Sequence, residues 1–131
     1  MVSTTGLSLF DGLHAGLGKA LEITQARQLI TNGNLANVNT PGYLAKEIPF
    51  SELLGEALHR SVGGEEVEVS SLLEERLTEL EAPDSALDGN SVDLEREAGQ
   101  VEQNKLFYQA MVGGTSRRLA MLKYAASDGR S

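Results

Sequence analysis

Residues 34–43 read Asn-Leu-Ala-Asn-Val-Asn-Thr-Pro-Gly-Tyr, and this stretch decides how the first third of the chain folds. The segment before it is helical in pattern, but Pro41 disfavours a helical backbone at Thr40. Gly42 can then adopt the positive φ angle of a tight turn. The stretch therefore predicts a helix over residues 7–39 that ends in a sharp change of direction.

The same stretch carries polar side chains in positions that suit packing between helices. Asn34 and Asn37 lie one turn apart, so their amides share a helix face and each can donate and accept hydrogen bonds. Tyr43 offers a flat apolar ring and a hydroxyl for one further hydrogen bond. From these residues alone, an ordinary helix stop and an interaction surface are both possible.

The predicted N-terminal helix has a poor pattern. Its apolar residues do not fall on one clean stripe, and four glycines interrupt it: Gly12, Gly16, Gly18 and Gly33. Each glycine costs up to about 1 kcal/mol relative to alanine in a helix interior. We expect the first turns to be weakly held in the free protein.

The C-terminal segment, residues 92–126, has the clearest helical pattern. Steps of four and three residues meet a mostly apolar row, which we call the seam: Leu94, Ala98, Val101, Tyr108, Val112, Leu119 and Leu122. This repeat is typical of a coiled coil. Lys105 interrupts the seam, and Gly113-Gly114 invites a bend. The pattern does not distinguish an intramolecular hairpin from a coiled coil between subunits.

The middle of the chain, residues 40–91, is acidic and irregular. Residues 65–88 hold nine acids and one base, whereas acids and bases balance over the rest of a chain whose net charge is −8. A short helix is predicted over residues 51–60, and a second begins at Ser71, which with Glu74 fits the capping-box spacing. Residues 83–90 are predicted to form a loop.

These patterns predict a mainly α fold within a single domain, residues 1–131. Its long terminal helices pack as a hairpin or coiled coil, and its irregular acidic middle carries one or two short helices.

Several function classes are disfavoured by the sequence. No basic patch appears, which argues against nucleic-acid binding, and no apolar stretch could serve as a cleaved signal or a membrane anchor. The chain has no cysteine, and His14 and His59 lack the spacing of metal ligands. No catalytic, metal or cofactor motif is present, so we expect neither an enzyme nor a bound cofactor.

Two stretches carry a family resemblance. Residues 34–43 resemble the N-terminal signature of flagellar rod and hook proteins, approximately Asn-(Leu or Ile)-Ala-Asn-x-x-Thr-x-Gly-Tyr. The matching residues, which we call the assembly motif, are Asn34, Leu35, Ala36, Asn37, Asn39, Thr40, Pro41, Gly42 and Tyr43. Residues 88–112 are similar to the C-terminal region of proximal rod proteins of the FlgB type. The other short proximal rod protein carries an insertion before the tyrosine, which is absent here.

The resemblance implies a structural subunit of the flagellar basal-body rod. Such a subunit is exported by the flagellar type III apparatus without a cleaved signal. It then polymerises in the periplasm with itself and other rod and basal-body proteins into a helical tube that transmits torque. Polymerisation of that kind requires two different patches on each subunit.

The alternatives are another short flagellar axial protein, or an acidic helical adaptor or chaperone that uses residues 65–88 to bind a basic partner. A small hydrolase with paired carboxylates is a third, but it lacks any motif.

Overall fold

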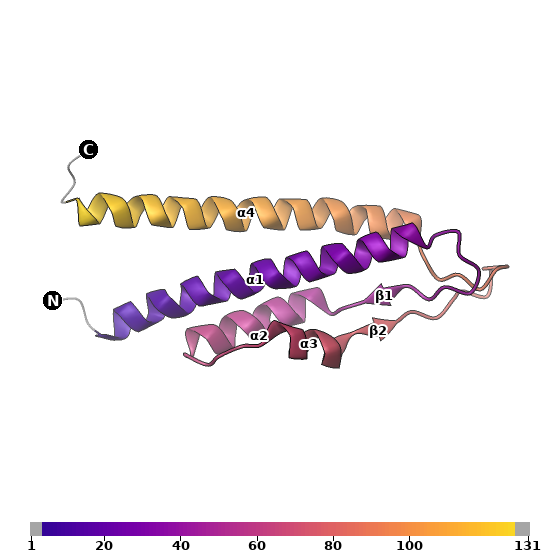
Figure 1. The fold of residues 1–131 in the computed structure, drawn as a ribbon, viewed down its shortest axis with the longest axis horizontal. Helices are drawn as coiled ribbons and strands as arrows, with labels where there is room; N and C mark the ends of the chain where they lie inside the picture. Colours follow the sequence, from indigo (N-terminus) through magenta and orange to yellow (C-terminus); the bar gives the residue numbers. More distant parts are fainter. Residues whose placement is uncertain (1–3, 128–131) are drawn as a thin grey trace.

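The computed structural model describes residues 4–127 of the chain. Four helices make up most of it: α1 (Thr4–Ala36), α2 (Phe50–Val62), α3 (Val69–Arg76) and α4 (Leu94–Ala126). Figure 1 shows an elongated molecule in which α1 runs through the middle, with α4 along one side and α2 and α3 along the other. Helices α1 and α4 run in opposite directions, which confirms the predicted mainly α fold with long terminal helices.

Two short strands were not predicted. Strands β1 (Lys46–Glu47) and β2 (Thr78–Glu79) pair antiparallel, with Lys46 opposite Glu79 and Glu47 opposite Thr78. Each strand has only two residues, which is too short for an alternating pattern to be visible in the sequence. The pair ties the segment after α1 to the segment after α3.

The helix boundaries differ from the predicted ones in detail. Helix α1 ends at Ala36, three residues before the expected end, and turns follow it through Gly42. The predicted capping box at Ser71 and Glu74 was wrong, because α3 begins at Val69 and its N-cap residue, Glu68, forms no side-chain cap. Helix α4 is continuous through Gly113-Gly114.

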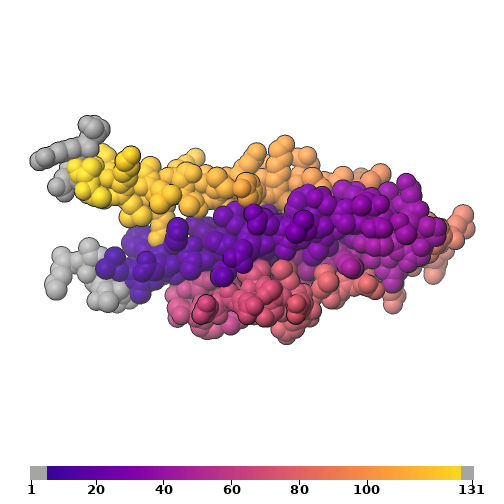
Figure 2. Space-filling model, in the orientation of Figure 1, coloured from indigo at the N-terminus to yellow at the C-terminus, as the bar shows by residue number. Residues whose placement is uncertain are grey.

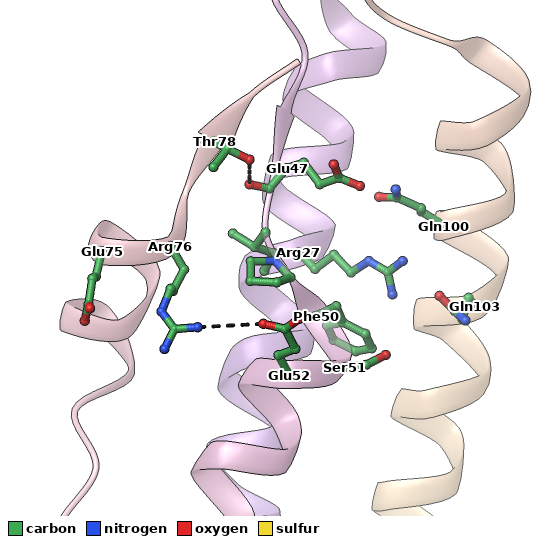
Figure 3. Close-up of a pocket in the computed structure, with 12 residues that line it drawn as sticks. Arg27, Glu47, Phe50, Ser51, Glu52, Glu75, Arg76, Thr78, Gln100 and Gln103 are labelled. Carbon is green, nitrogen blue, oxygen red and sulfur yellow. Dashed lines mark hydrogen bonds and ion pairs between the residues drawn. The ribbon is translucent and has the colours of Figure 1, made fainter. Parts of the chain in front are cut away.

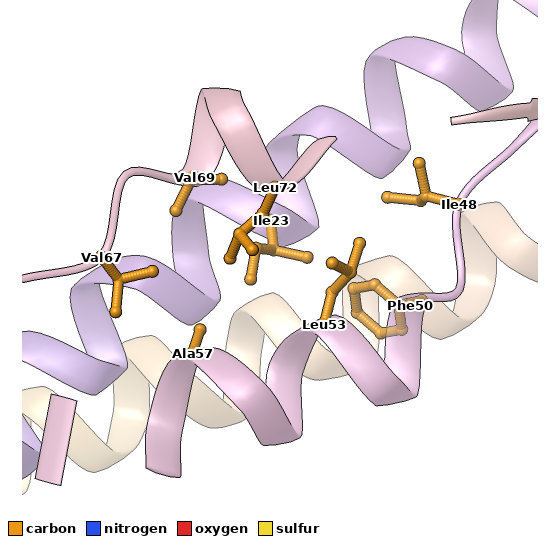
Figure 4. Close-up of a cluster of buried hydrophobic side chains, with 8 residues drawn as sticks. All are labelled: Ile23, Ile48, Phe50, Leu53, Ala57, Val67, Val69 and Leu72. Atoms are coloured by element: carbon orange, nitrogen blue, oxygen red, sulfur yellow. The ribbon is translucent and has the colours of Figure 1, made fainter. Parts of the chain in front are cut away.

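The apolar core lies between α1, α2 and α3, as Figure 4 shows. It is formed by one residue of α1 and seven from the segment 48–72: Ile23, Ile48, Phe50, Leu53, Ala57, Val67, Val69 and Leu72. Burial of each large apolar side chain contributes roughly 1.5–3 kcal/mol. Within residues 4–127, α4 supplies no member of this cluster.

Two glycines of α1 allow α2 to approach closely. A Cβ atom at Gly12 would lie 2.6 Å from the backbone oxygen of Ser61, and one at Gly16 would lie 2.7 Å from the side chain of Leu58. By contrast, a Cβ at Gly18 would meet nothing within 4 Å. Some of the glycines that weaken α1 as a helix are therefore needed for its packing.

Helix α4 leaves most of its large apolar side chains in solvent. Exposed on it are Leu94, Leu106, Phe107, Tyr108, Val112, Leu119, Met121, Leu122 and Tyr124. Its start is well capped, since the side chain of Asp93 accepts hydrogen bonds from the backbone N–H groups of Glu95 and Arg96, each at 3.1 Å. The helix is thus locally favourable although it adds little to the core.

Candidate assembly surface

The side chain of Asn34 joins three parts of the chain. Its amide nitrogen donates to the backbone oxygen of Lys46 at 2.8 Å and to Oε1 of Glu97 at 3.1 Å. Its amide oxygen accepts from the backbone N–H of Lys46 at 2.9 Å and from the hydroxyl of Tyr43 at 3.3 Å. Both donors and both acceptor positions of this buried amide are used. Asn34 therefore fixes α1, β1 and α4 relative to one another.

The rest of the assembly motif builds the turn after α1. Asn37 donates to the backbone oxygen of Gly33 at 2.9 Å and accepts from the hydroxyl of Thr40 at 3.1 Å. Gly42 has a φ of 72°, the positive value expected from the sequence. The predicted hydrogen bond of the Tyr43 hydroxyl is also confirmed. Of the other members, Leu35 is half-buried, whereas Ala36, Asn39 and Pro41 are exposed.

The second stretch with a family resemblance, residues 88–112, begins with residues that hydrogen-bond to this turn. The amide nitrogen of Asn90 donates to the backbone oxygens of Asn37, Val38 and Thr40, at 2.8, 3.1 and 2.8 Å. The backbone N–H of Gly42 also donates to the oxygen of Asp88, at 2.8 Å. Two stretches about fifty residues apart in the chain therefore form one corner of the molecule.

Beyond the corner, α1 and α4 meet through a ladder of polar side chains. Its three rungs are Gln28 with Asn104 at 3.1 Å, Thr31 with Gln100 at 3.2 Å, and Asn34 with Glu97 at 3.1 Å. Residue numbers rise along α1 as they fall along α4, so the ladder specifies an antiparallel register. Sequence reasoning missed these pairs, although polar residues three and four apart on both helices were a visible signal.

The seam lies beside this ladder and is mostly uncovered in the chain. Val101 is half-buried, and the other six seam residues are exposed: Leu94, Ala98, Tyr108, Val112, Leu119 and Leu122. The helix face toward α1 instead carries Glu97, Gln100 and Asn104. A partner for the seam stays a prediction.

Two grooves run along the junction of α1 and α4. The first, of about 660 Å³, brings the seam residues Val101 and Tyr108 next to Thr24 and Gln28. The second, of about 360 Å³, lies toward the free ends of both helices. It is lined mainly by apolar side chains from both helices, among them Leu7, Phe10, Leu119 and Leu122. Figure 1 shows α1 and α4 diverging toward these ends.

A third, charged cavity of about 620 Å³ is lined by residues of all four helices and of β1, with Arg27 of α1 in its middle, as Figure 3 shows. The Arg27 guanidinium lies 4.2 Å from the ring centroid of Phe50, and Phe50 meets Phe107 edge to face at 5.3 Å. Burial lowers the pKa of Arg27 below its ordinary value, while the carboxylates of Glu47 and Glu97 act to raise it. Arginine nevertheless stays charged, so this is a structural contact between α1, α2 and α4.

Ion pairs of Arg76, which also lines this cavity, hold α3 against α2. Arg76 lies 3.8 Å from a carboxylate oxygen of Glu52 and 3.2 Å from one of Glu56. Among residues 4–127, no group of three or more His, Cys, Asp or Glu residues is placed to hold a metal ion. No helix within the same range is both long enough and apolar enough to cross a membrane.

Comparison with known proteins gives consistent matches, although no protein-family model matches the chain. The flagellar basal body rod protein FlgB of Bacillus subtilis is 28% identical over 130 residues, covering 95% of this chain and 100% of that protein. FlgB of Escherichia coli is 30% identical over 127 residues, covering 85% and 92%. FlgB of Cereibacter sphaeroides is 30% identical over 125 residues, covering 87% and 91%.

These relatives come from three different bacteria, carry the same name and match this chain over nearly their whole length. The matched region contains both stretches that form the corner. The chain belongs to the FlgB family of flagellar basal-body rod proteins.

Proposed function

We propose that this protein is a structural subunit of the proximal rod of the bacterial flagellum, and that it assembles rather than catalyses. The observation that carries the proposal is the exposed seam: α4 has 33 residues and only two buried ones, Glu97 and Asn104. A free helix face with large apolar side chains gains stability when a partner removes it from water, by roughly 25 cal/mol per Å² of apolar surface. The names of the relatives support the rod as the place where that happens.

In this proposal the partners are further copies of the chain and other rod and basal-body proteins. The protein reaches the periplasm through the flagellar export apparatus without a cleaved signal peptide, and the assembled tube transmits torque. Each subunit contributes a hairpin of α1 and α4, and the assembly motif sets the angle between the two helices. Asn34 and Asn90 act inside the subunit in this arrangement, because their amides already bond within the chain.

The contacts between subunits are heterologous in this proposal. A helical tube needs one patch that binds a different patch on the neighbour, because a self-complementary patch closes into a dimer. The seam is one such patch. Its Val112 and Leu119 are exposed and form no part of the polar ladder, so a neighbouring helix can cover them without disturbing that ladder.

The test places a carboxylate on the seam. Val112 is 39% exposed, so Val112→Asp should leave the isolated fold intact while preventing burial of that position in the rod. A strain lacking the gene, complemented with Val112→Asp, should express the protein but form no rod and not swim. The matched control is Leu106→Asp, since Leu106 lies on α4, is 65% exposed and is outside the seam. Normal swimming with Val112→Asp would rule out the seam as an assembly contact.

A further inference from the structure

A pair of glycines in α4 is not required by the packing of the fold. Gly113 and Gly114 lie inside a continuous helix, where glycine is less favourable than alanine. Among the described residues, a Cβ atom on either glycine would meet nothing within 4 Å. Gly12 differs, because its missing side chain lets α2 approach α1. Close packing therefore does not explain the pair, whereas a change of helix direction would use the freedom of glycine.

The helix beside the pair also favours bending. The hydroxyl of Thr115 donates to the backbone oxygen of Met111 at 2.9 Å, so this bond spans both glycines. A hydroxyl that bonds to the carbonyl four residues earlier often bends a helix. Residues 115–126, which we call the arm, form the part of α4 beyond the pair and are about 18 Å long. A small bend at the pair therefore displaces the end of the arm by several ångströms.

The arm faces the first turns of α1 across the second groove, where Figure 1 shows the two helices diverging. The wall from α1 consists of Leu7, Phe10, Asp11 and His14, and the wall from α4 consists of Thr115, Arg118, Leu119 and Leu122. The four large apolar residues among them are each more than half exposed. Two apolar surfaces that face each other therefore both lie in water.

Arg118 already connects the two walls. Its guanidinium lies 5.1 Å from the ring centroid of Phe10 and donates to the backbone oxygen of that residue. Asp11 is exposed on the same wall as Phe10 and forms no ion pair within residues 4–127. Apolar side chains thus face apolar side chains and an acid faces a base, so each wall is complementary to the other.

The arm and the first turns of α1 carry opposite charges. The arm contains three bases and no acid, whereas residues 4–16 contain one acid and no lysine or arginine. Glu66 lies beside the same turns of α1, since it lines a hollow together with Asp11. Exposed charges act over about 8 Å at physiological ionic strength. The attraction therefore operates across the groove, between two segments of one chain.

We propose that Gly113-Gly114 is a hinge by which the arm closes onto the first turns of α1 in the free subunit. Closure brings the two walls of the groove together and removes Leu119 and Leu122 from water. Both residues belong to the seam, so the closed subunit withholds this part of the seam from a neighbour until assembly opens it. This inference rests on the proposed function, because the seam contact is what closure regulates.

Closure within one chain has an advantage over contact with a second molecule. The arm is tethered beside α1, so its effective concentration is high and does not depend on the concentration of the protein. Burial of the facing apolar side chains then stabilises the closed state. A neighbouring subunit competes for Leu119 and Leu122, so closure and assembly exclude each other at these positions.

The distance between the arm and α1 can be measured on the full-length protein, because the chain has no cysteine. Leu9→Cys with Met121→Cys carries a pair of spin labels, since both residues are exposed and neither lines the groove. Pulsed electron paramagnetic resonance on the dilute protein should show a shorter distance from closed chains. Gly113→Ala with Gly114→Ala should reduce that component at least several-fold, because alanine stiffens the helix.

The matched control is Gly33→Ala with Gly99→Ala. These glycines also lie in the long helices, and a Cβ atom on either would meet nothing within 4 Å. The control therefore gains the same helix propensity away from the hinge and should keep the shorter distance. A single long distance in the spin-labelled protein without alanine substitutions would overturn closure. Equal effects of the two pairs of substitutions would overturn the hinge.

This outcome can be separated from the test of the proposed function. Loss of swimming with Val112→Asp, combined with one unchanged long distance, rejects the hinge and leaves the rod subunit supported. Normal swimming with Val112→Asp, combined with a shorter distance that only Gly113→Ala with Gly114→Ala removes, rejects the seam as an assembly contact. The closing movement would then stand without the regulatory role proposed for it.

Discussion

Asn34 shows how one residue can hold the geometry of a signature sequence. Its four hydrogen bonds reach Tyr43, β1 and α4, and the side chain is buried. A shorter or apolar side chain would leave the backbone groups of Lys46 and the carboxylate of Glu97 without this partner. Each buried polar group left unpaired costs about 1–3 kcal/mol, and more when it is charged.

We expect Asn34→Ala to lower the free energy of unfolding by about 3 kcal/mol, because the backbone groups of Lys46 and the carboxylate of Glu97 lose the amide as a partner. Urea unfolding followed by circular dichroism measures this change. Asn39→Ala is the matched control, since Asn39 is an exposed asparagine of the same motif. It should change stability by less than about 0.5 kcal/mol. Equal effects of the two variants would show that Asn34 has no special role in the fold.

Glycines of α1 offer a pair of substitutions with opposite expected signs. Gly12→Ala should destabilise the protein by about 1–3 kcal/mol, because its Cβ would meet backbone atoms of α2 at 2.6 and 2.9 Å. Gly18→Ala should stabilise it by about 0.5–1 kcal/mol, since its Cβ meets nothing within 4 Å and alanine favours the helix. Thermal unfolding of both variants checks the signs. A stabilised Gly12→Ala would contradict the close packing of α1 against α2.

At the level of elements, α4 differs from the other helices in the contacts that attach it to the rest of the fold. Helices α1, α2 and α3 share an apolar core, whereas α4 is attached by the polar ladder, by the ion pair of Arg96 with Glu47 and by the contact of Phe107 with Phe50. Polar pairs specify register more than they add stability, because their bonds to water are nearly as favourable in the unfolded chain. Helix α4 is thus well aligned and weakly bound.

Hydrogen exchange on the dilute protein tests this difference. We expect backbone amides of residues 112–126 to exchange at least about tenfold faster than those of α2, because local opening of α4 exposes little apolar surface. Amides of residues 97–104 should be intermediate, since the ladder lies there. Uniform protection along α1, α2 and α4 would show that α4 unfolds only together with the core.

For the whole molecule, the division between core and α4 predicts the behaviour of a shortened chain. A chain of residues 1–93 keeps all eight core residues and the hydrogen bonds that Asn90 donates to the turn after α1. We expect it to unfold cooperatively on heating. Its midpoint temperature of unfolding should be lower, because the hydrogen bond of Asn34 to Glu97 and the ring contact of Phe50 with Phe107 are lost. Differential scanning calorimetry makes the measurement. A non-cooperative transition would show that α4 is required for the fold.

The shape in Figure 2 has a consequence for assembly. The molecule is long and narrow, with α1 flanked by α4 on one side and α2 and α3 on the other. A body of this shape offers long lateral surfaces, one of which carries the seam along α4. The proposed seam contact therefore uses a long side of the molecule.

The sequence by itself determined the elements that depend on local rules. Pro41 and Gly42 predicted the end of the first long helix to within three residues, and the steps of three and four residues marked the second. The assembly motif and residues 88–112 also indicated the family. These features can be predicted from the sequence because backbone restrictions and helical periodicity act over a few residues.

Only the tertiary structure decided which faces meet. The seam pattern left open whether the apolar residues of α4 pack within the chain or against another subunit. In the fold, Asn34, Thr31 and Gln28 of α1 bond to a polar line of α4 and leave most of the seam exposed. Asn90 and Gly12 acquire their roles from partners about fifty residues away in the chain. Such pairings depend on the summed packing and hydrogen bonding of distant segments, which no local pattern encodes.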